Sequence, residues 1–358
     1  MEDVEAIIER SQRGAAISLE EIEALLSIEE PNSLDKLFNA ALKVKERHFG
    51  NKVFFYGFVY FSTHCRNDCS FCFYRRSNQK SYRYRKNDEE VLSLATSLAD
   101  SGVHAIDLTM GEDPGIHHDD QYQRLLDLVR MVNDAVDTPL MLSPGALPHR
   151  VFTDLRDAGV DWFACYQETH NRELFCRLRP DQNYDLRLLQ KKWAREVGIL
   201  AEEGIMVGVG ETISDRARSI MLMKDLGVDQ VRAMSFVPQP NTPMAEHGAP
   251  SNLAELKTIA VMRLVHPTKL IPASLDIEGI AGLAPRLAAG ANVITSIIPP
   301  QKGLAGVAQH ELGIDDGSRS IENILSVLDE LGVRGASLSE YRSLLQEWKG
   351  NGSAEALG

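Results

Sequence analysis

The chain has 358 residues, of which 44% are hydrophobic and 25% charged, and its formal net charge is -13 at pH 7. These proportions are ordinary for a soluble globular protein, and the length suits one large domain with additions at its ends. The acidic balance argues against nucleic acid as a partner, because phosphate contacts need a basic face. Residues 1–5 are acidic where a signal peptide would be basic, and no apolar run approaches the length of a membrane span. We therefore expect a cytoplasmic protein with a small-molecule substrate and no membrane partner.

Residues 1–50 predict an N-terminal helical extension. Ser18 and Glu21 have the spacing of a capping box, and Ile22, Leu25 and Leu26 follow at helical spacing. Residues 351–358 predict a flexible tail, because they are small, polar and terminal. The main domain is expected at residues 51–350, with the extension covering the N-terminal end of its strands.

Within the main domain, the end of a helix, a glycine and a short apolar strand recur. The pattern is found at Gly102, Gly159, Gly204, Gly227 and Gly290. A glycine just past a helix can take the left-handed conformation that terminates it. Eight strands are expected, at residues 53–61, 105–111, 139–143, 161–168, 205–211, 230–237, 270–279 and 292–298. Their alternation with helices predicts an α/β fold, a (β/α)8 TIM-type barrel; a doubly wound sheet is the rival, but no G-x-G-x-x-G follows the first strand.

Three cysteines directly follow the first predicted strand, in the run Cys65-Arg-Asn-Asp-Cys69-Ser-Phe-Cys72. Three thiolates can hold three corners of one [4Fe-4S] cluster and leave one iron open for a ligand that is not protein. A zinc-stabilised binding module is the alternative from another class of protein. It is disfavoured because structural zinc takes four ligands, and His64 is adjacent to Cys65. A disulfide framework is disfavoured by the odd total of 5 cysteines.

The spacing of the cysteines, with Phe71 before the third, resembles the signature of the radical S-adenosylmethionine (SAM) enzymes. This resemblance implies that Cys65, Cys69 and Cys72 bind the cluster and that SAM chelates its open iron. It also implies an external electron donor, such as flavodoxin or ferredoxin. The expected cofactors are therefore one [4Fe-4S] cluster and SAM.

Other segments resemble the SAM-binding segments of the biotin-synthase-like branch of that family. The residues after the second strand look like the segment that holds the SAM amino group, with Met110 where the family has its first glycine. The resemblance implies that Glu168 contacts the ribose or the amino group of SAM. It also implies that either Arg187 or Arg179 pairs with the SAM carboxylate. Alternatively, these residues form an ordinary turn, a helix cap and a solvated helix face. The predicted cofactor-binding residues are Tyr74, Gly111, Glu112, Asp113, Glu168, Arg179, Arg187, Gly208 and Gly210.

The alternation of side chains along the predicted strands places several polar groups inside the barrel. Asp107 and Thr109 share the inward face of one strand, Ser274 and Asp276 that of another, and Arg232 lies on a third. An arginine with two aspartates suits a ligand that carries a carboxylate and ammonium groups, such as a diamine amino acid. A structural ion pair between Arg232 and Asp276 is the alternative. The predicted substrate-binding residues are Asp107, Thr109, Arg232, Ser274 and Asp276.

Along nearly its whole length, including residues 235–243, the sequence is similar to the methylornithine synthase family of this branch. The resemblance implies a radical SAM mutase of pyrrolysine biosynthesis. Such an enzyme is an isomerase that rearranges L-lysine to (3R)-3-methyl-D-ornithine through a 5′-deoxyadenosyl radical. Another enzyme of the branch, such as an iron-hydrogenase maturase, is the alternative. Sulfur insertion is disfavoured because Cys165 and Cys176 are too few to bind a second cluster.

Overall fold

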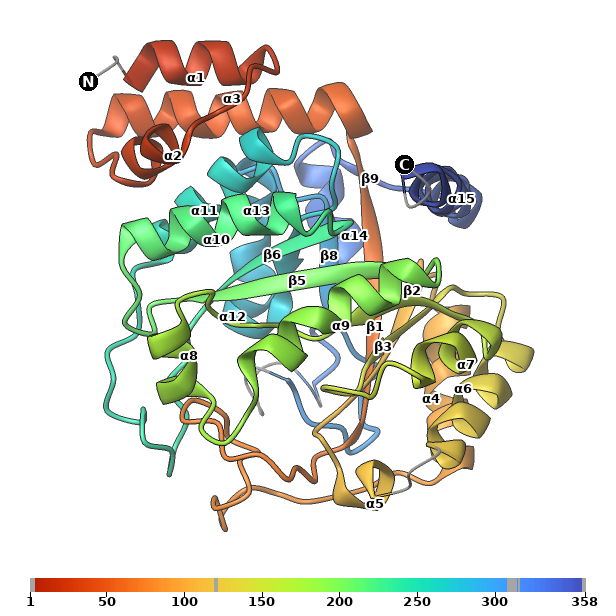
Figure 1. Ribbon diagram of the computed structural model, residues 1–358. Coiled ribbons are helices and arrows are strands. Elements are labelled where there is room, and N and C mark those ends of the chain that lie inside the picture. The colour runs from red at the N-terminus through yellow and green to blue at the C-terminus, as the bar shows by residue number, and fades with distance from the viewer. Residues whose placement is uncertain (1–3, 119–121, 308–313, 315, 356–358) are drawn as a thin grey trace.

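The computed structural model describes residues 4–118, 122–307, 314 and 316–355. Its strands are β1 (Lys52–Ser62), β2 (Ala105–Met110), β3 (Leu140–Ser143), β4 (Val160–Ala164), β5 (Leu200–Val207), β6 (Gln230–Ser235), β7 (Pro272–Ser274), β8 (Val293–Ile297) and the two-residue β9 (Arg334–Gly335). The first eight are parallel neighbours in the order β6-β5-β4-β3-β2-β1-β8-β7 (Figure 1). One bridge between Gln230 and Leu270 joins the two ends of this path. The predicted (β/α)8 TIM-type barrel is therefore confirmed.

Helices precede, separate and follow the barrel strands (Figure 1). Before β1 lie α1 (Val4–Gln12), α2 (Leu19–Leu26) and α3 (Pro31–Phe49). Between β1 and β8 along the chain come α4 (Asp88–Asp100), α5 (Pro114–His117), α6 (Gln123–Ala135), α7 (Val151–Asp157), α8 (Arg172–Leu178), α9 (Tyr184–Glu196), α10 (Ile213–Asp225), α11 (Asn252–Val265), α12 (Leu275–Glu278), the 3-10 turn η1 (Gly279–Gly282) and α13 (Leu283–Ala288). After β8 come α14 (Ile321–Glu330) and α15 (Leu338–Glu355).

Several predicted strand boundaries were wrong, and the two largest errors are at the start of β5 and at the end of β7. Strand β5 begins at Leu200, and Gly204 lies inside it, because α9 already ends before Gly198, which has φ +84°. The sequence Val197-Gly198-Ile199 carries the same helix-glycine-apolar pattern that was assigned to Gly204. Strand β7 ends at Ser274, where the predicted strand continued to residue 279. The Ser274 hydroxyl accepts a hydrogen bond from the Asp276 amide (3.2 Å) and so starts α12.

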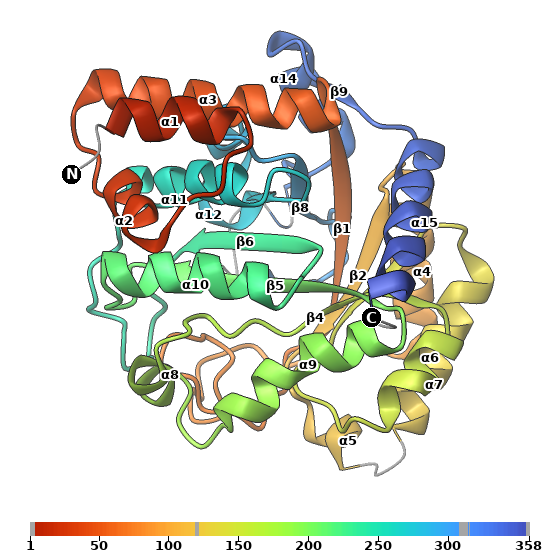
Figure 2. The same ribbon diagram turned by 45° about the horizontal axis from the view of Figure 1, so that its top comes forward.

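The N-terminal helices lie outside the barrel. Helices α2 and α3 pack against α10, α11 and α13, and α15 lies away from them in both views (Figures 1 and 2). The start of β4 contacts α15 instead, where Lys349 pairs with Asp161 (2.6 Å). The expectation that residues 1–50 cover the N-terminal end of the strands therefore missed α15. The predicted tail also begins inside α15, which continues to Glu355, and residues 356–358 lie outside the described part of the chain.

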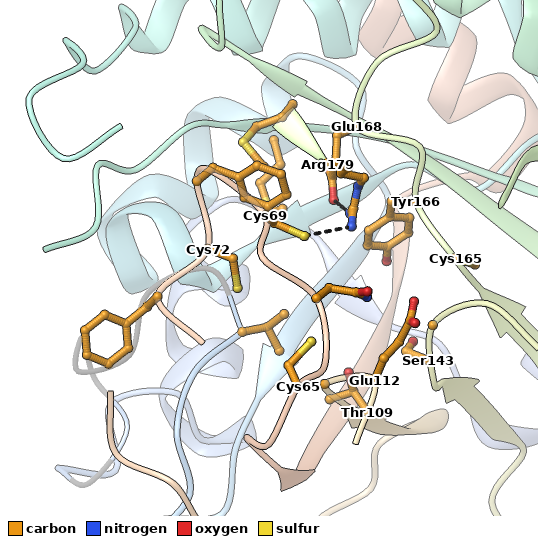
Figure 3. Close-up of a pocket in the computed structure, with 18 of the residues that line it drawn as sticks. Cys65, Cys69, Cys72, Thr109, Glu112, Ser143, Cys165, Tyr166, Glu168 and Arg179 are labelled. Carbon is orange, nitrogen blue, oxygen red and sulfur yellow. Dashed lines mark hydrogen bonds and ion pairs between the residues drawn. The ribbon is translucent and has the colours of Figure 1, made fainter. Parts of the chain in front are cut away.

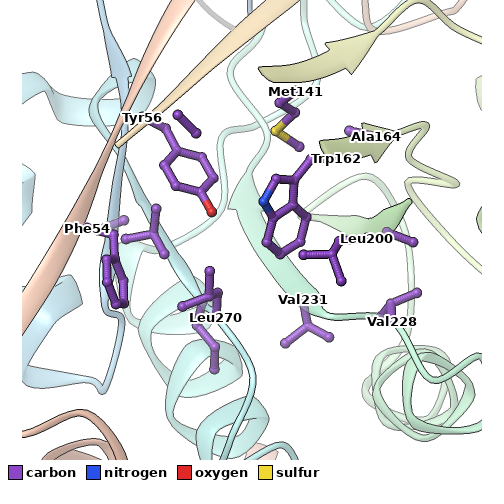
Figure 4. Close-up of a cluster of buried hydrophobic side chains, with 14 of the residues drawn as sticks. Phe54, Tyr56, Met141, Trp162, Ala164, Leu200, Val228, Val231 and Leu270 are labelled. Carbon is purple, nitrogen blue, oxygen red and sulfur yellow. The ribbon is translucent and has the colours of Figure 1, made fainter. Parts of the chain in front are cut away.

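Large side chains fill the N-terminal part of the barrel (Figure 4). Trp162, Tyr56 and Val231 are fully buried there. The Tyr56 hydroxyl lies 2.6 Å from the hydroxyl of Tyr341, which α15 supplies. This packing fills the lumen at that end, so the lumen can open toward the C-terminal ends of the strands. Among the described residues, no helix has the length and apolar character needed to cross a membrane.

Candidate active site

The cysteine loop, residues 63–86, joins β1 to α4 and lies against the segment that follows β2. The Arg66 amide donates to the Glu112 carbonyl (2.9 Å), and the Gly111 amide donates to the Ser62 carbonyl (2.9 Å). A Cβ atom on Gly111 would lie 2.3 Å from the His64 carbonyl oxygen, so no other residue fits without moving the loop. Gly111 thus permits the close approach of two backbones that positions the cysteines.

All three cysteines line one pocket at the C-terminal ends of the strands (Figure 3). The pocket has about 1060 Å³ of empty space, part of which is open to solvent. Of the other predicted site residues, it brings together Thr109, Gly111, Glu112, Glu168, Arg179 and Arg187. Besides the cysteines after β1, the pocket lining includes residues that follow β2, β3, β4, β6 and β8, as expected for the catalytic end of such a barrel.

Arg179 links a cluster cysteine to a carboxylate. Its guanidinium donates to Glu168 Oε1 (2.6 Å) and to Cys69 Sγ (3.4 Å), as the dashed lines in Figure 3 mark. Glu168 has φ +66°, a conformation that is uncommon outside glycine, and its amide and carbonyl pair with β5. Arg179 Nε is buried without a hydrogen-bond partner among the described residues. The pair is thus fixed at the pocket wall with one donor still unused.

Arg187 and Glu112 form a second charged pair in the pocket. Arg187 donates to Glu112 Oε1 (3.3 Å) and to the Tyr166 carbonyl (2.7 Å). Arg66 and the Ala146 amide also donate to the Glu112 carboxylate. Burial opposes the charge on Glu112, but Arg187 and the other nearby cations lower its pKa below the ordinary value. Glu112 is therefore an anion that faces the pocket.

Four predicted cofactor-binding residues lie outside the pocket lining. Asp113 caps α5 and accepts two hydrogen bonds of 2.6 Å from Arg85, so this carboxylate is already satisfied. Tyr74 is buried and donates to the Gly306 carbonyl (3.1 Å). Gly208 and Gly210 lie after β5, with φ +90° and +100°, and not within the strand as predicted. The turn after β5 requires glycine at these two positions because their φ values are positive. The sequence alone could not distinguish this conformational requirement from contact with a ligand.

Below the pocket lies a buried polar network around Glu202. Glu202 accepts hydrogen bonds from Arg232 Nε (2.7 Å) and from the Tyr166 hydroxyl (2.8 Å). The Tyr166 ring lines the pocket, and the Arg232 guanidinium lies 5.5 Å from its centroid. Arg232 Nη2 has no hydrogen-bond partner among the described residues. Arg232 therefore lies inside the barrel, although Glu202 and not Asp276 is its partner.

Asp107 belongs to the same layer. Its side chain accepts a hydrogen bond from Ser143 (2.9 Å), and its Oδ1 has no partner within the described ranges. Burial is the main cause that raises the pKa of Asp107 to about 7, and the nearby charge of Glu202 acts in the same direction. An unpaired donor on Arg232 and an unpaired acceptor on Asp107 thus share the lumen.

Asp276 is engaged elsewhere. Its carboxylate pairs with Arg319 and accepts a hydrogen bond from Ser296 (3.0 Å). The predicted alternative of an ion pair with Arg232 was therefore wrong. Ser274 caps α12, and its hydroxyl lies 3.4 Å from that of Ser296. Alternation along the strand could not reveal Arg319, because this partner follows β8.

The sequence analysis missed several residues of the site. Ser143 ends β3, Gly145 follows it, and Tyr166 follows β4; all three line the pocket. A polar or glycine residue at or just after the end of a predicted strand was a usable signal for Ser143 and Gly145, whereas Tyr166 lay inside the predicted strand 161–168. Glu202 was missed because its segment was interpreted as the end of a helix. Cys165, which the sequence analysis did not assign to the site, is buried and also lines the pocket.

Comparisons with known proteins identify the family. Residues 59–223 match the Radical SAM superfamily. A 3-methylornithine synthase of Methanosarcina acetivorans is 40% identical over 345 residues, which are 96% of this chain and 98% of that protein. The chain belongs to the 3-methylornithine synthase family. A crystal structure of methylornithine synthase (PylB) has a TM-score of 0.89 and 38% sequence identity, and the match covers 94% of this chain and 99% of that one.

Within the radical SAM enzymes, the 3-methylornithine synthase family has relatives of other function. The [FeFe] hydrogenase maturase subunit HydE of Thermotoga maritima is 31% identical, over 80% of this chain and 82% of that protein. The predicted family is confirmed, and with it the prediction of an enzyme.

The pocket has the chemical groups that the cofactors of this family need. Three thiols face it, together with two carboxylates and two guanidiniums that could meet the ammonium and carboxylate of SAM. Burial raises the pKa of Cys65 to about 11 and also raises that of Cys72, so these thiolates need a positively charged ligand. No three His, Cys, Asp or Glu side chains of the described ranges converge closely enough to hold a metal ion.

Proposed function

We propose that this protein rearranges L-lysine to (3R)-3-methyl-D-ornithine for pyrrolysine biosynthesis. The observation that carries the proposal is the 40% identity to a 3-methylornithine synthase over 96% of the chain. The pocket supports it chemically, since it combines three thiols with charged groups for an amino acid cofactor, and its lining residues Ser143 and Tyr166 donate hydrogen bonds to the buried Asp107 and Glu202. When bound, the reduced cluster and SAM supply a 5′-deoxyadenosyl radical, which removes a hydrogen atom from the substrate.

The proposed role of the cysteines is to hold the cluster, and that of the two charged pairs is to orient SAM. Arg187 would bind the SAM carboxylate and Glu112 its ammonium, because both face the pocket and neither is fully satisfied by the other. Arg179 donates to Cys69, so its proposed role is to stabilise the thiolate and position Glu168. Met206, Met234 and Phe236 add apolar walls that would exclude water and keep fragments of the substrate together.

The proposed anchors of L-lysine are Asp107 and Arg232, with Thr109 at the rim. Arg232 has a free donor for the substrate carboxylate, and Asp107 has a free acceptor for an ammonium group. A bound ammonium would favour the ionised form of Asp107. Contact of the substrate with Ser274 or Asp276 stays a prediction, which requires Arg319 to leave the Asp276 carboxylate.

An acidic one-electron carrier, such as flavodoxin or ferredoxin, is the proposed reductant. The thiols lie in a pocket and form no disulfide among the described residues, which agrees with a reducing compartment. The cytoplasm therefore stays the predicted location.

The test is product analysis with anaerobically reconstituted protein. Wild type with SAM, a reductant and L-lysine should yield 3-methylornithine, identified by mass spectrometry, together with cleaved SAM. The Cys69→Ala variant is the matched control. It should remain folded, because the cysteine lies in a loop, and should lack both the cluster and SAM cleavage. SAM cleavage by wild type that L-lysine neither accelerates nor couples to a new product would overturn the proposed substrate.

A further inference from the structure

We propose that the outer face of the cysteine loop is the docking surface for an acidic one-electron carrier protein. The basic docking surface consists of Arg76 and Lys80 of the loop and Arg177 at the end of α8. All three side chains are exposed. This inference rests on the proposed function, because only a cluster that must be reduced needs such a partner.

The cysteine loop concentrates positive charge on an acidic protein. From Cys65 to Lys86 the sequence has seven Lys and Arg residues against one Asp, a net charge of +6. Since the whole chain carries -13, the other 336 residues together carry -19. A local charge of the opposite sign steers an oppositely charged partner to one face of a protein.

Most cations of the loop are neutralised within the structure. Arg66, Arg75, Arg85 and Lys86 each pair with a carboxylate. Arg83 instead donates to backbone carbonyls, among them those of Tyr74 and Arg75. Because their side chains already form ion pairs or hydrogen bonds within the structure, these residues stabilise the loop and are poorly suited to binding a partner.

The three residues of the basic docking surface have no such carboxylate partner within the described part of the chain. The Arg76 guanidinium donates a long hydrogen bond of 3.4 Å to the Arg66 carbonyl. Within the described ranges, the side chains of Lys80 and Arg177 form no ion pair. Two residues after Lys80, Tyr82 is 70% exposed, the most exposed large hydrophobic residue of the described ranges. Exposed aromatic and arginine side chains are typical of a protein-binding surface.

The basic docking surface is tied directly to the residues that would hold the cluster. The Arg76 amide donates to the Asn67 carbonyl (2.8 Å), and Asn67 lines the pocket between two of the cysteines in sequence. The Ser70 hydroxyl and amide, next to Cys69, bind the carbonyls of Arg177 and Leu178 (2.6 and 2.8 Å). Figure 1 shows the loop along the lower edge of the molecule, between α8 and α5. Because Asn67 and Ser70 lie between the cysteines in sequence, the loop offers a short route for an electron to the cluster site.

The partner must carry negative charge and donate single electrons. A phosphate ligand fits less well, because the three cations come from two separate segments of the chain. Hydrated, spaced cations on a surface attract a large acidic face over distances near the Debye length.

The experiment measures the rate of cluster reduction by stopped-flow absorbance with reduced flavodoxin as the probe. The test variant is Arg76→Glu/Lys80→Glu/Arg177→Glu. The control is Lys43→Glu/Arg124→Glu/Lys224→Glu, which changes the net charge equally at exposed residues of α3, α6 and α10. Reduction of each protein by photoreduced 5-deazariboflavin, a small neutral reductant, reports whether the cluster is intact.

At low ionic strength, reduction of the test variant by flavodoxin should be slower than that of wild type by about tenfold or more. Its rate should also lose the steep decrease with salt that wild type shows between roughly 0.01 and 0.15 M. The control variant should stay near wild type, and all three proteins should react alike with 5-deazariboflavin. Equal flavodoxin rates for test variant and wild type, or equal losses in both variants, would overturn the proposal. A wild-type cluster that is reduced yet yields no methylornithine would instead count against the proposed function.

Discussion

Replacing Asp107 with asparagine should stabilise the empty protein and weaken its binding of L-lysine. Asp107 is 1% exposed and accepts one hydrogen bond from Ser143, and its pKa is raised to about 7 by burial. Asparagine keeps the size of the side chain and can keep the bond to Ser143. The substitution therefore removes little except the negative charge.

The magnitude follows from the shift in pKa. The rise from 3.8 to about 7 corresponds to on the order of 4 kcal/mol of folding free energy. Because the folded-state pKa lies above the unfolded one, the stabilisation is complete below about pH 4 and is lost as the pH rises through about 7. Asp107→Asn does not titrate, so its stability relative to wild type should increase over this range.

The assay is urea unfolding of the cluster-free protein at intervals from pH 5 to pH 8. The difference in unfolding free energy between variant and wild type should grow by a few kcal/mol over the interval. Asp127→Asn, at an exposed carboxylate of α6, is the control and should follow wild type within about 0.5 kcal/mol. Parallel pH curves for Asp107→Asn and wild type would refute the assignment of a buried, mostly neutral carboxyl.

The same variant tests the substrate site by calorimetry with reconstituted protein and SAM. Loss of a charge-assisted hydrogen bond to an ammonium group costs roughly 1.5–3 kcal/mol, or about 10- to 100-fold in affinity for L-lysine. Unchanged affinity would show that the ammonium is held elsewhere. Asp276 would then be the next residue to test.

Two further substitutions address the cofactor site and the buried ion pair between Lys191 of α9 and Glu203 of β5. Arg187→Gln should weaken SAM binding by roughly 1.5–3 kcal/mol in equilibrium dialysis while iron content stays unchanged; unaltered affinity would transfer the carboxylate-binding role to Arg179. Lys191→Met should destabilise the protein by about 3–5 kcal/mol in urea, because it leaves the carboxylate of Glu203 buried without its ion-pair partner. Adding Glu203→Gln should restore part of that loss, and a single variant as stable as wild type would disprove the importance of the pair.

The fold could be predicted largely because the residues that end its helices and begin its strands are adjacent in sequence. Glycines after helix ends, such as Gly102 and Gly159, have φ values of +88° and +100° and precede strands as expected. The same signal failed at Gly204, since Gly198 provides it six residues earlier. That one displaced boundary hid Glu202, the partner of Arg232.

The site was predictable where function depends on position after a strand. The cysteines, Glu112 and Glu168 reach one pocket because parallel strands end at the same edge of the barrel. The contacts between side chains inside the barrel were not predictable. The alternation of side chains along a strand shows which of them face inward, but not which residue of another strand or loop each one contacts. Asp276 and Arg319 are 43 residues apart, and only the closed fold brings them together.

The barrel closes through a single bridge between β6 and β7, with two backbone hydrogen bonds, from Val231 to Leu270 and from Leu270 to Asp229. Every other neighbouring pair of barrel strands is held by at least three paired positions. The barrel is thus held together least strongly at this seam between β6 and β7, and widening it there breaks the fewest backbone hydrogen bonds. Arg232 and Ser274 lie on the two strands that flank this seam, so any widening of the barrel there would displace them, whereas the cysteines follow β1, which pairs with β2 at six positions.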